Sequence, residues 1–249
     1  MPRTHKSLPR FFVDQPLSLG QELVLERARG NYLITVLRRK EGDQLVVFNG
    51  KDGAWLAEIA ANGKKSASLK LIRLSTPQTP PADIWYGFAP LKSARLDYMI
   101  QKATEMGVGV MQPVLTQHTQ NMRSKTEKLR ANAVEAAEQC EVLNIPRIAP
   151  ETKLTTLIQN WRAEHGDRVL IVADEEKAAE TPVGAVQELE GRKIGLLIGP
   201  EGGFSNDERH LLHSLEFVVP ISLGPRILRA DTAAVAALTV IQSIIGDWR

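Results

Sequence analysis

The chain has 249 residues, 43% hydrophobic and 24% charged, with a formal net charge of +2; this composition argues against extensive disorder and fibrous repeats, and the length fits two domains. The single cysteine, Cys140, excludes an internal disulfide and a cysteine-rich zinc site, so neither an oxidising compartment nor a metal is expected. No apolar stretch reaches signal-peptide length at the N-terminus or the roughly 20 residues of a membrane span, so we expect a cytoplasmic protein without a membrane partner.

The first 73 residues have the pattern of a small β domain. An apolar run at 44–48 and a second run at 54–60 flank a turn rich in asparagine and glycine, which predicts a hairpin. A further turn is predicted at Asn62 and Gly63, followed by a strand at 66–72 in which Leu69 and Leu71 alternate with polar positions. These short strands favour a barrel or a sandwich. Three prolines within 75–81 interrupt regular structure, so we place a linker at 74–82.

From residue 83 to 249 short apolar runs alternate with amphipathic segments, which is typical of an α/β domain with a mostly parallel sheet. Strands are predicted at 84–89, 108–114, 168–173, 193–198 and 217–223, and helices at 94–106, 124–143, 205–215 and 230–245. Ser124 with Glu127, and Ser205 with Glu208, predict capping boxes at two helix starts. The last helix is apolar almost all round, so we expect it to pack on the sheet and on something else, such as a second subunit.

Two segments, 198–205 and 223–232, share one plan of an apolar strand, Gly-Pro, a tight loop and a helix. Such loops lie at the carboxyl edge of an open parallel sheet, where ligands bind. Neither segment has a Walker or dinucleotide motif, and Glu201 would repel a polyphosphate. A cofactor with a neutral adenine edge and a positively charged sulfonium has no such conflict. The alternative interpretation is two structural turns, with Glu201 favouring a helix N-terminus.

These two segments, together with 101–108, 136–140, 32–38 and 42–50, closely resemble the RsmE family of 16S ribosomal RNA uracil-N3 methyltransferases. The resemblance implies a PUA-like RNA-binding β-barrel at 1–73 and a SPOUT methyltransferase domain at 83–249 with a C-terminal trefoil knot. It also implies a cytoplasmic homodimer that uses S-adenosylmethionine to methylate N3 of a uridine in the decoding region of 16S rRNA, within the small ribosomal subunit. The chain departs from the family pattern at Val142, where arginine is frequent, and at Asp231, where glutamate is usual.

Uracil N3 becomes a nucleophile only when its proton leaves and the negative charge is stabilised. Arg229, at the start of the last helix, is the first candidate for that stabilisation; alternatively, it holds the C-terminal segment through a carboxylate. Glu201 or Asp231 is a candidate acceptor of the N3 proton, although such carboxylates are more often partners of an arginine.

The remaining predicted site residues fall into two groups. Those expected to contact the cofactor are Ala173, Ile198, Gly199, Pro200, Gly202, Leu223, Gly224, Ile227 and Leu228. Those expected to contact RNA phosphates, in a salt-dependent way, are Arg3, Lys6, Arg10, Arg38, Arg39, Lys92 and Arg95. A solvated tail and a charged helix end are the alternatives for the basic residues of the first domain.

Three other functions remain open from the sequence. A SPOUT enzyme acting on another RNA atom, such as a ribose 2′-hydroxyl, would share the cofactor loops. A non-catalytic RNA-binding module would not bind S-adenosylmethionine. An ordinary α/β enzyme for a small metabolite is the third, and the basic first domain argues against it.

Overall fold

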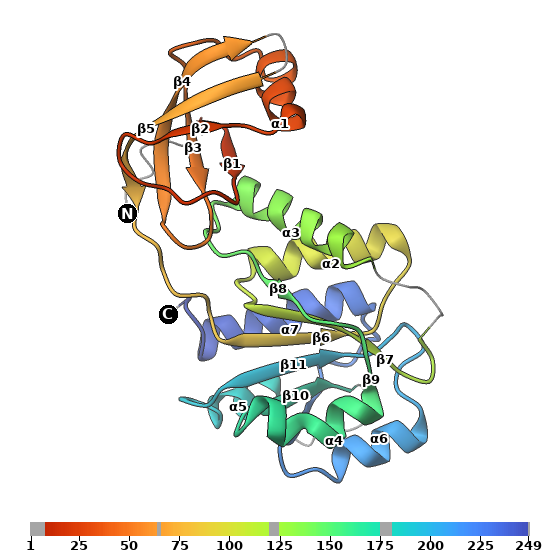
Figure 1. The fold of residues 1–249 in the computed structure, drawn as a ribbon. Coiled ribbons are helices and arrows are strands. Elements are labelled where there is room, and N and C mark those ends of the chain that lie inside the picture. Colours follow the sequence, from red (N-terminus) through yellow and green to blue (C-terminus); the bar gives the residue numbers. More distant parts are fainter. Residues whose placement is uncertain (1–7, 64–65, 120–124, 175–180, 249) are drawn as a thin grey trace. The chain divides into compact units, whose positions relative to one another are not determined.

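A computed structural model of the chain describes residues 8–63, 66–119, 125–174 and 181–248. The chain divides into two compact units, which are described separately below. One comprises Met1–Pro80 and Ala137–Asn144, and the other comprises Pro81–Ala136 and Ile145–Arg249 (Figure 1). The predicted RNA-binding residues Arg3 and Lys6, and the predicted helix cap Ser124, lie outside the described residues.

The first unit is built on a five-stranded sheet. Its strands are β1 (Arg10–Phe12), β2 (Glu22–Val24), β3 (Gln44–Phe48), β4 (Ala54–Gly63) and β5 (Ser66–Thr76). They lie in the order β1-β3-β4-β5-β2, with β1 parallel to β3 and the other neighbours antiparallel. The hairpin predicted at 44–60 is confirmed, because Phe48 pairs with Ala54. The turn predicted at Asn62 and Gly63 is wrong, because the ladder continues through both residues to a pair between Gly63 and Ser66.

Alternate residues of these strands form the core of the first unit. Leu45 and Val47 of β3 and Leu69 and Leu71 of β5 are buried in one apolar cluster, which confirms the alternation predicted for β5. Leu33 adds to this cluster from a helical segment that the sequence did not predict, made of α1 (Arg27–Asn31) and the π-helical turn η1 (Tyr32–Val36). Because one face of the sheet is buried in this way, its register is strongly fixed.

The second unit is a parallel sheet between two layers of helices (Figure 1). Its strands are β6 (Ile84–Phe88), β7 (Val110–Leu115), β8 (Arg147–Ile148), β9 (Thr152–Lys153), β10 (Val169–Ala173), β11 (Ile194–Ile198) and β12 (Val218–Ile221). Its helices are α2 (Ser93–Glu105), α3 (Thr126–Cys140, whose residues from Ala137 onward belong to the first unit), α4 (Leu154–His165), α5 (Pro182–Gln187), α6 (Asn206–His213) and α7 (Ala230–Ile244). The strand order is β12-β10-β11-β6-β7-β8, with β9 beside β7, and every pair is parallel. The predicted α/β class with a mostly parallel sheet is therefore confirmed.

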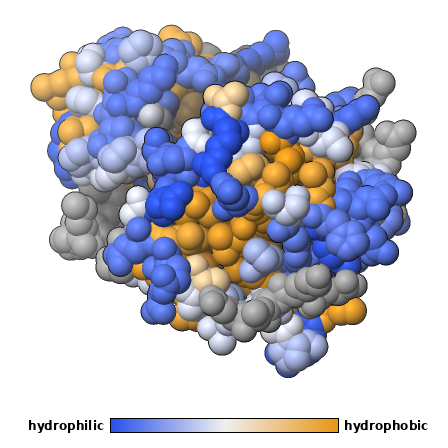
Figure 2. Space-filling view, turned by 90° about the horizontal axis from the view of Figure 1, so that it is seen from below, coloured by the Kyte–Doolittle hydropathy of each residue, from blue (hydrophilic) through white to orange (hydrophobic). Residues whose placement is uncertain are grey.

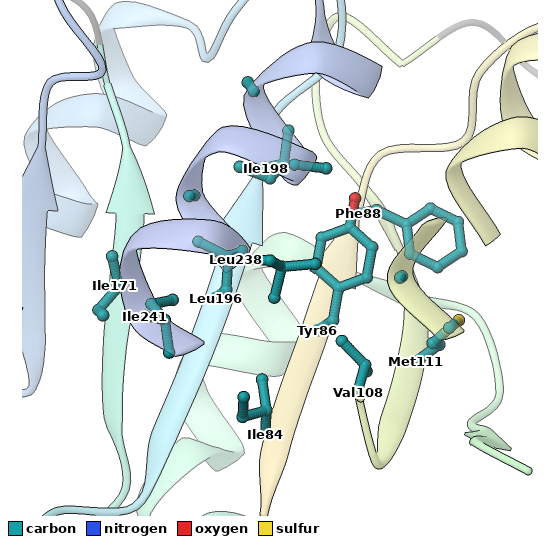
Figure 3. Packing of buried hydrophobic residues seen from close by; sticks show 14 of the residues in the cluster. Ile84, Tyr86, Phe88, Val108, Met111, Ile171, Leu196, Ile198, Leu238 and Ile241 are labelled. Carbon is teal, nitrogen blue, oxygen red and sulfur yellow. The ribbon is translucent and has the colours of Figure 1, made fainter. Parts of the chain in front are cut away.

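Successive residues of the central strands are buried on opposite faces of this sheet, which explains their continuous apolar runs. On one face, Tyr86, Ile171 and Leu196 pack in a cluster that includes Leu238 and Ile241 of α7 (Figure 3). The other face packs against α4 and α6. Its buried strand residues include Trp85, Leu170 and Leu197, and the helices contribute Leu157, Trp161 and Leu212.

The helices follow the predicted positions with differences at their ends. The capping box predicted at α6 is confirmed, because Ser205 Oγ accepts the backbone N–H of Glu208 and the Glu208 carboxylate accepts that of Ser205. Helix α3 ends at Cys140 rather than at 143, because Glu141 adopts a left-handed backbone conformation with φ +60°. No helix was predicted where α4 lies.

The helix predicted at 230–245 is confirmed as α7, and its buried positions include Ala234, Leu238 and Ile241. Apolar residues also reach the surface over a broad area of the face shown in Figure 2. Within the described part of the chain, no helix has both the length and the apolar character needed to cross a bilayer.

Candidate active site

A crevice of about 670 Å³, part of it open to solvent, lies at the carboxyl ends of three neighbouring strands, β10, β11 and β12. Because β10 lies between the other two strands, the loops that leave β11 and β12 stand on either side of its end. The residues that line the crevice are Ala173, Asp174, Ile198, Gly199, Pro200, Glu201, Gly203, Phe204, Arg209, Leu223, Gly224, Arg226, Ile227, Leu228, Ala230 and Ala233. Ligand sites of open parallel sheets occur at this kind of edge.

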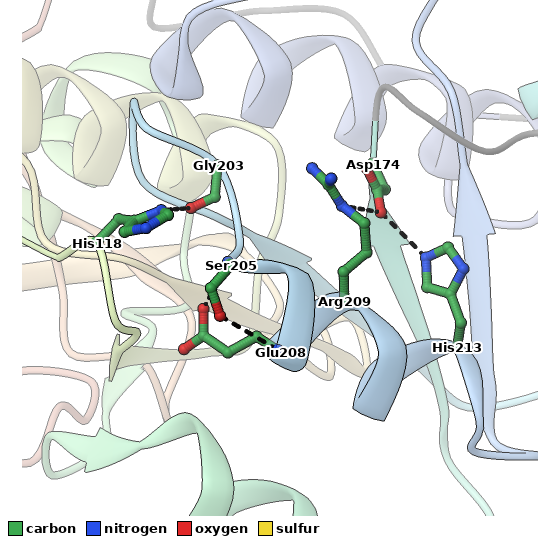
Figure 4. A network of polar contacts seen from close by, with 7 residues as sticks. All are labelled: His118, Asp174, Gly203, Ser205, Glu208, Arg209 and His213. Atoms are coloured by element: carbon green, nitrogen blue, oxygen red, sulfur yellow. Dashed lines mark hydrogen bonds and ion pairs between the residues drawn. The ribbon is translucent and has the colours of Figure 1, made fainter.

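The first loop connects β11 to α6. It turns tightly at Pro200, whose carbonyl oxygen accepts the backbone N–H of Gly203 at 2.9 Å. A Cβ atom at position 199 would lie 3.0 Å from the ring of Phe204, so any larger residue there would require this ring to shift. The buried Phe204 ring thus packs directly against the backbone of the loop. His118 contacts the same loop, with Nδ1 3.2 Å from the carbonyl oxygens of Gly202 and Gly203 (Figure 4). Since carbonyls only accept, Nδ1 must carry a proton.

The second loop connects β12 to α7. Gly224 adopts φ +111°, a conformation that side-chain-bearing residues rarely take. Ile227, further along this loop, has 82% of its surface exposed although it is a large apolar residue. Leu228 is half-buried, and the chain enters α7 two residues later. The loop therefore presents apolar side chains and bare backbone to the crevice.

All the predicted cofactor residues except Gly202 line this crevice. The structure thus brings Ala173, the strand end Ile198 and the two glycine-proline loops together in one place. Gly202 lies in the same turn, but its neighbour Gly203 is the one that lines the crevice. That these residues bind a cofactor stays a prediction.

The predicted catalytic residues occupy three different environments. Glu201 lines the crevice and forms an ion pair with Arg95 of α2. Arg229 is the N-cap residue of α7, and its side chain is 66% exposed. Asp231 is buried in the first turn of α7, where Oδ1 accepts the backbone N–H of Thr232 at 3.0 Å. The Arg229 Nε atom lies 3.9 Å from this Oδ1 atom. Neither Arg229 nor Asp231 lines the crevice, although the intervening Ala230 does.

Beneath the first turn of α7, the hydroxyl group of Tyr86 is buried and has no hydrogen-bond partner among the described residues. Burial and the negative charge of Asp231 both raise the pKa of Tyr86. The phenol therefore stays protonated and can only act as a neutral donor near that carboxylate.

The predicted RNA-binding residues are divided between the two units. In the first unit, the Arg10 guanidinium lies over the Phe48 ring at 5.1 Å from its centroid, while Arg38 is exposed with φ +53° and Arg39 is half-buried. In the second unit, Lys92 is the exposed N-cap residue of α2, and Arg95 follows in the first turn.

Sequence reasoning missed a cluster of polar side chains made of Asp174, Arg209 and His213, of which Asp174 and Arg209 line the crevice. The Asp174 Oδ2 atom lies 3.0 Å from both Arg209 Nε and His213 Nε2 (Figure 4). Two signals were available. Asp174 directly follows the apolar run of β10, and Arg209 and His213 are four residues apart on a predicted helix, so they share one face.

Comparison with family models also finds two domains in the chain. Residues 78–242 match an RNA methyltransferase domain, and residues 25–72 match the PUA domain of RNA methyltransferases. The fold and the crevice therefore belong to an RNA methyltransferase that carries a PUA-like N-terminal domain.

Two curated proteins called ribosomal RNA small subunit methyltransferase E are similar over most of the chain. The protein of Rickettsia conorii is 36% identical over 213 residues, which are 85% of each chain. That of Buchnera aphidicola from Acyrthosiphon pisum is 30% identical over 258 residues, with 98% of this chain and 97% of the relative covered. The present chain belongs to this ribosomal RNA small subunit methyltransferase E family.

A solved structure supports the same fold. A Legionella pneumophila protein, described as a methyltransferase in complex with the bound cofactor SAM, superposes with a TM-score of 0.81 at 27% identity. The match covers 95% of this chain and 97% of the other.

Proposed function

We propose that this protein transfers a methyl group from S-adenosylmethionine to N3 of a uridine in the decoding region of 16S rRNA, in the small ribosomal subunit. The observation that carries the proposal is the crevice formed by two glycine-proline loops at the ends of adjacent parallel strands. The names of the curated relatives and the cofactor of the Legionella protein support the same activity. Such a reaction belongs in the cytoplasm, where ribosomal RNA is found in a bacterium.

The residues of the crevice fit this cofactor. The exposed Ile227 offers an apolar surface on which an adenine ring can pack, and the backbones of Gly199 and Gly224 can approach a ligand without a side chain in between. Adenosine therefore has an apolar surface and a closely approachable backbone in the two loops.

When bound, S-adenosylmethionine supplies a methyl group that is already electrophilic. The protein must orient uracil N3 and stabilise the negative charge that develops on the base. Arg229 is suited to the second task, because its exposed guanidinium begins at the residue next to the crevice-lining Leu228. The Arg229 Nε atom lies 3.9 Å from Asp231 Oδ1, so the guanidinium still has N–H groups that can donate to the base.

Either Asp231 or Glu201 accepts the N3 proton in this proposal. Asp231 is buried beside a neutral phenol, whereas Glu201 is paired with Arg95 on a partly exposed surface. The variants D231N and E201Q remove one acceptor each. The true acceptor is the carboxylate whose removal lowers kcat by about 100-fold or more, the usual contribution of a general base, whereas removal of a positioning carboxylate should cost less.

RNA binding is assigned in the proposal to both units. Residues 1–73 form the RNA-binding domain, 74–82 the linker and 83–249 the catalytic domain, whose C-terminal segment threads the trefoil knot. RNA phosphates contact Arg3, Lys6, Arg10, Arg38, Arg39, Lys92 and Arg95. The active form is a homodimer, and this is supported by half-exposed apolar residues of α7 such as Val235, Val240 and Ile244.

The decisive experiment incubates the full chain with labelled S-adenosylmethionine and small ribosomal subunits, naked rRNA or tRNA. Nucleoside mass spectrometry then identifies the product, which we expect to be 3-methyluridine. A ribose-methylated nucleoside would instead identify another target atom, and the absence of any product or cofactor binding would favour a non-catalytic module. We expect R229A to lower kcat about 100-fold. The control R192A, which removes an equal charge before β11 and away from the crevice, should keep wild-type activity.

A further inference from the structure

The short turn that follows β7 is closed at both ends and anchored to α6. The carbonyl oxygen of Thr116 accepts the backbone N–H of Thr119 at 3.1 Å, and Thr119 Oγ1 accepts the backbone N–H of Thr116 at 2.9 Å. The backbone N–H of Gln117 donates to the Glu208 carboxylate at 2.7 Å. His118 therefore stands on a turn whose place beside the first crevice loop is fixed by hydrogen bonds of the residues before and after it.

The first crevice loop contains two consecutive glycines, Gly202 and Gly203. Gly203 has φ +68°, and without side chains both residues can adopt other backbone conformations at little cost. The peptide group that joins them is nevertheless held at both ends. Its N–H, from Gly203, donates to the Pro200 carbonyl at 2.9 Å, and its carbonyl, from Gly202, lies 3.2 Å from Nδ1 of His118.

The carbonyl of the next peptide group, from Gly203, also lies 3.2 Å from Nδ1 of His118 (Figure 4). One imidazole N–H is thus shared between two successive peptide groups of the loop. Glu201 and Gly203, on either side of Gly202, line the crevice, whereas His118 does not. The imidazole therefore acts on the crevice wall from another loop and without being part of the wall.

We propose that His118 is a positioning residue for the methyl transfer. Its Nδ1–H group holds Gly202 and Gly203 in the conformation that accepts S-adenosylmethionine, and the side chain does not touch the cofactor. Without this donor, the cofactor has to order the two glycines when it binds, and the entropy lost in doing so weakens binding. The inference rests on the proposed function and adds to it a residue outside the crevice.

The test measures the affinity of the full chain for S-adenosylmethionine by isothermal titration calorimetry, without RNA. H118A keeps the Cβ atom next to Gly202 but removes the ring, and it should bind about 3- to 10-fold more weakly, the fold-change that a typical hydrogen bond contributes. H118N places an amide N–H group close to the position of Nδ1, so its affinity should stay within about twofold of the wild type. H118D has the same shape but offers only acceptors to the two carbonyls, so it should bind at least as weakly as H118A.

Two further measurements separate positioning from a general loss of structure. Because the His118 side chain is exposed, the urea midpoints of all three variants should match the wild type. Hydrogen exchange of a peptide that covers residues 199–205 should be faster in H118A and H118D than in H118N. With small ribosomal subunits as substrate, H118A should raise the KM for the cofactor and leave kcat within about twofold. The control Q117A keeps the backbone N–H that reaches Glu208, so it should bind as the wild type does.

Equal affinities of H118A and the wild type would overturn the inference. Equal affinities of H118N and H118D would also overturn it, because the donor would then be irrelevant, and so would unchanged hydrogen exchange in H118A. A wild-type chain that does not bind S-adenosylmethionine would contradict the proposed function itself, so the two failures are distinguishable.

Discussion

The start of helix α6 offers a sharp test of how the crevice loop is held. The Glu208 carboxylate accepts two backbone N–H groups, that of Ser205 at 3.0 Å and that of Gln117 at 2.7 Å. It thereby ties the end of the first crevice loop to the loop that follows β7. The variant E208A removes both acceptors at once. Its matched control is D207A, which removes an acid from the same helical turn whose side chain accepts no hydrogen bond among the described residues.

The expected cost follows from the burial of the two donors. Ser205 is 9% exposed, so its amide finds little water when Glu208 is lost, at a cost of about 1.5–2 kcal/mol. Gln117 is exposed, and water replaces its bond for about 0.5 kcal/mol or less. The sum is a destabilisation of about 2 kcal/mol for E208A. D207A loses only a favourable charge at the helix N-terminus, worth about 0.5 kcal/mol.

Equilibrium urea unfolding measures this difference. Far-UV circular dichroism and tryptophan fluorescence report it together, since Trp85 and Trp161 are buried in the second unit. E208Q offers one amide oxygen in place of two carboxylate oxygens, so it should fall between E208A and the wild type. Equal unfolding free energies for E208A and D207A, within about 0.5 kcal/mol, would refute the reasoning.

Three further predictions concern the sheet face covered by α4 and α6, a half-buried imidazole and the crevice. Trp161 is fully buried, stacks on Phe217 and donates Nε1 to the Arg168 carbonyl at 2.9 Å; W161A should cost about 3–5 kcal/mol in urea unfolding, and a cost under 1 kcal/mol would contradict this packing. Burial and the nearby Arg168 lower the pKa of His165, so the unfolded chain binds more protons below about pH 6.5. The stability that depends on neutral His165 is thus complete above that pH and lost as the pH falls toward the folded-state pKa, and H165Q should flatten the fall of the urea midpoint between pH 7.5 and 5.5. I227A should change the unfolding free energy by less than about 0.5 kcal/mol, because the side chain is 82% exposed, yet weaken S-adenosylmethionine binding several-fold in calorimetry; unchanged affinity would remove Ile227 from the site.

Local sequence patterns predicted most strands and helices of the second unit, because each of these elements is determined by residues close together in the sequence. The run at β10 is apolar on both faces, and Ser205 with Glu208 specifies a helix start through bonds three residues apart. The spacing of Leu154, Leu157, Ile158 and Trp161 is also that of an amphipathic helix, although no helix was predicted there.

The polar contacts of the site could not be predicted in the same way, because they join residues far apart in sequence. Arg95 and Glu201 are separated by 106 positions, and Asp174 and His213 by 39. The sequence marks Asp174 as the residue after a strand, but only the strand order, with β10 between β11 and β12, shows that it faces α6. Likewise, β-bulges shift the pairing register between β4 and β5, and the predicted turn at Asn62 and Gly63 gives no indication of these shifts.

The position of β10 between β11 and β12 has a consequence for the order of events during synthesis. One wall of the crevice comes from the loop after β12, so the pocket cannot exist until the polypeptide up to Ala233 has left the ribosome and inserted at the sheet edge. A nascent chain that stops before β12 therefore has no competent pocket, whatever the state of its other strands. By mass action, a ligand held there would favour the chains whose final strand has already docked.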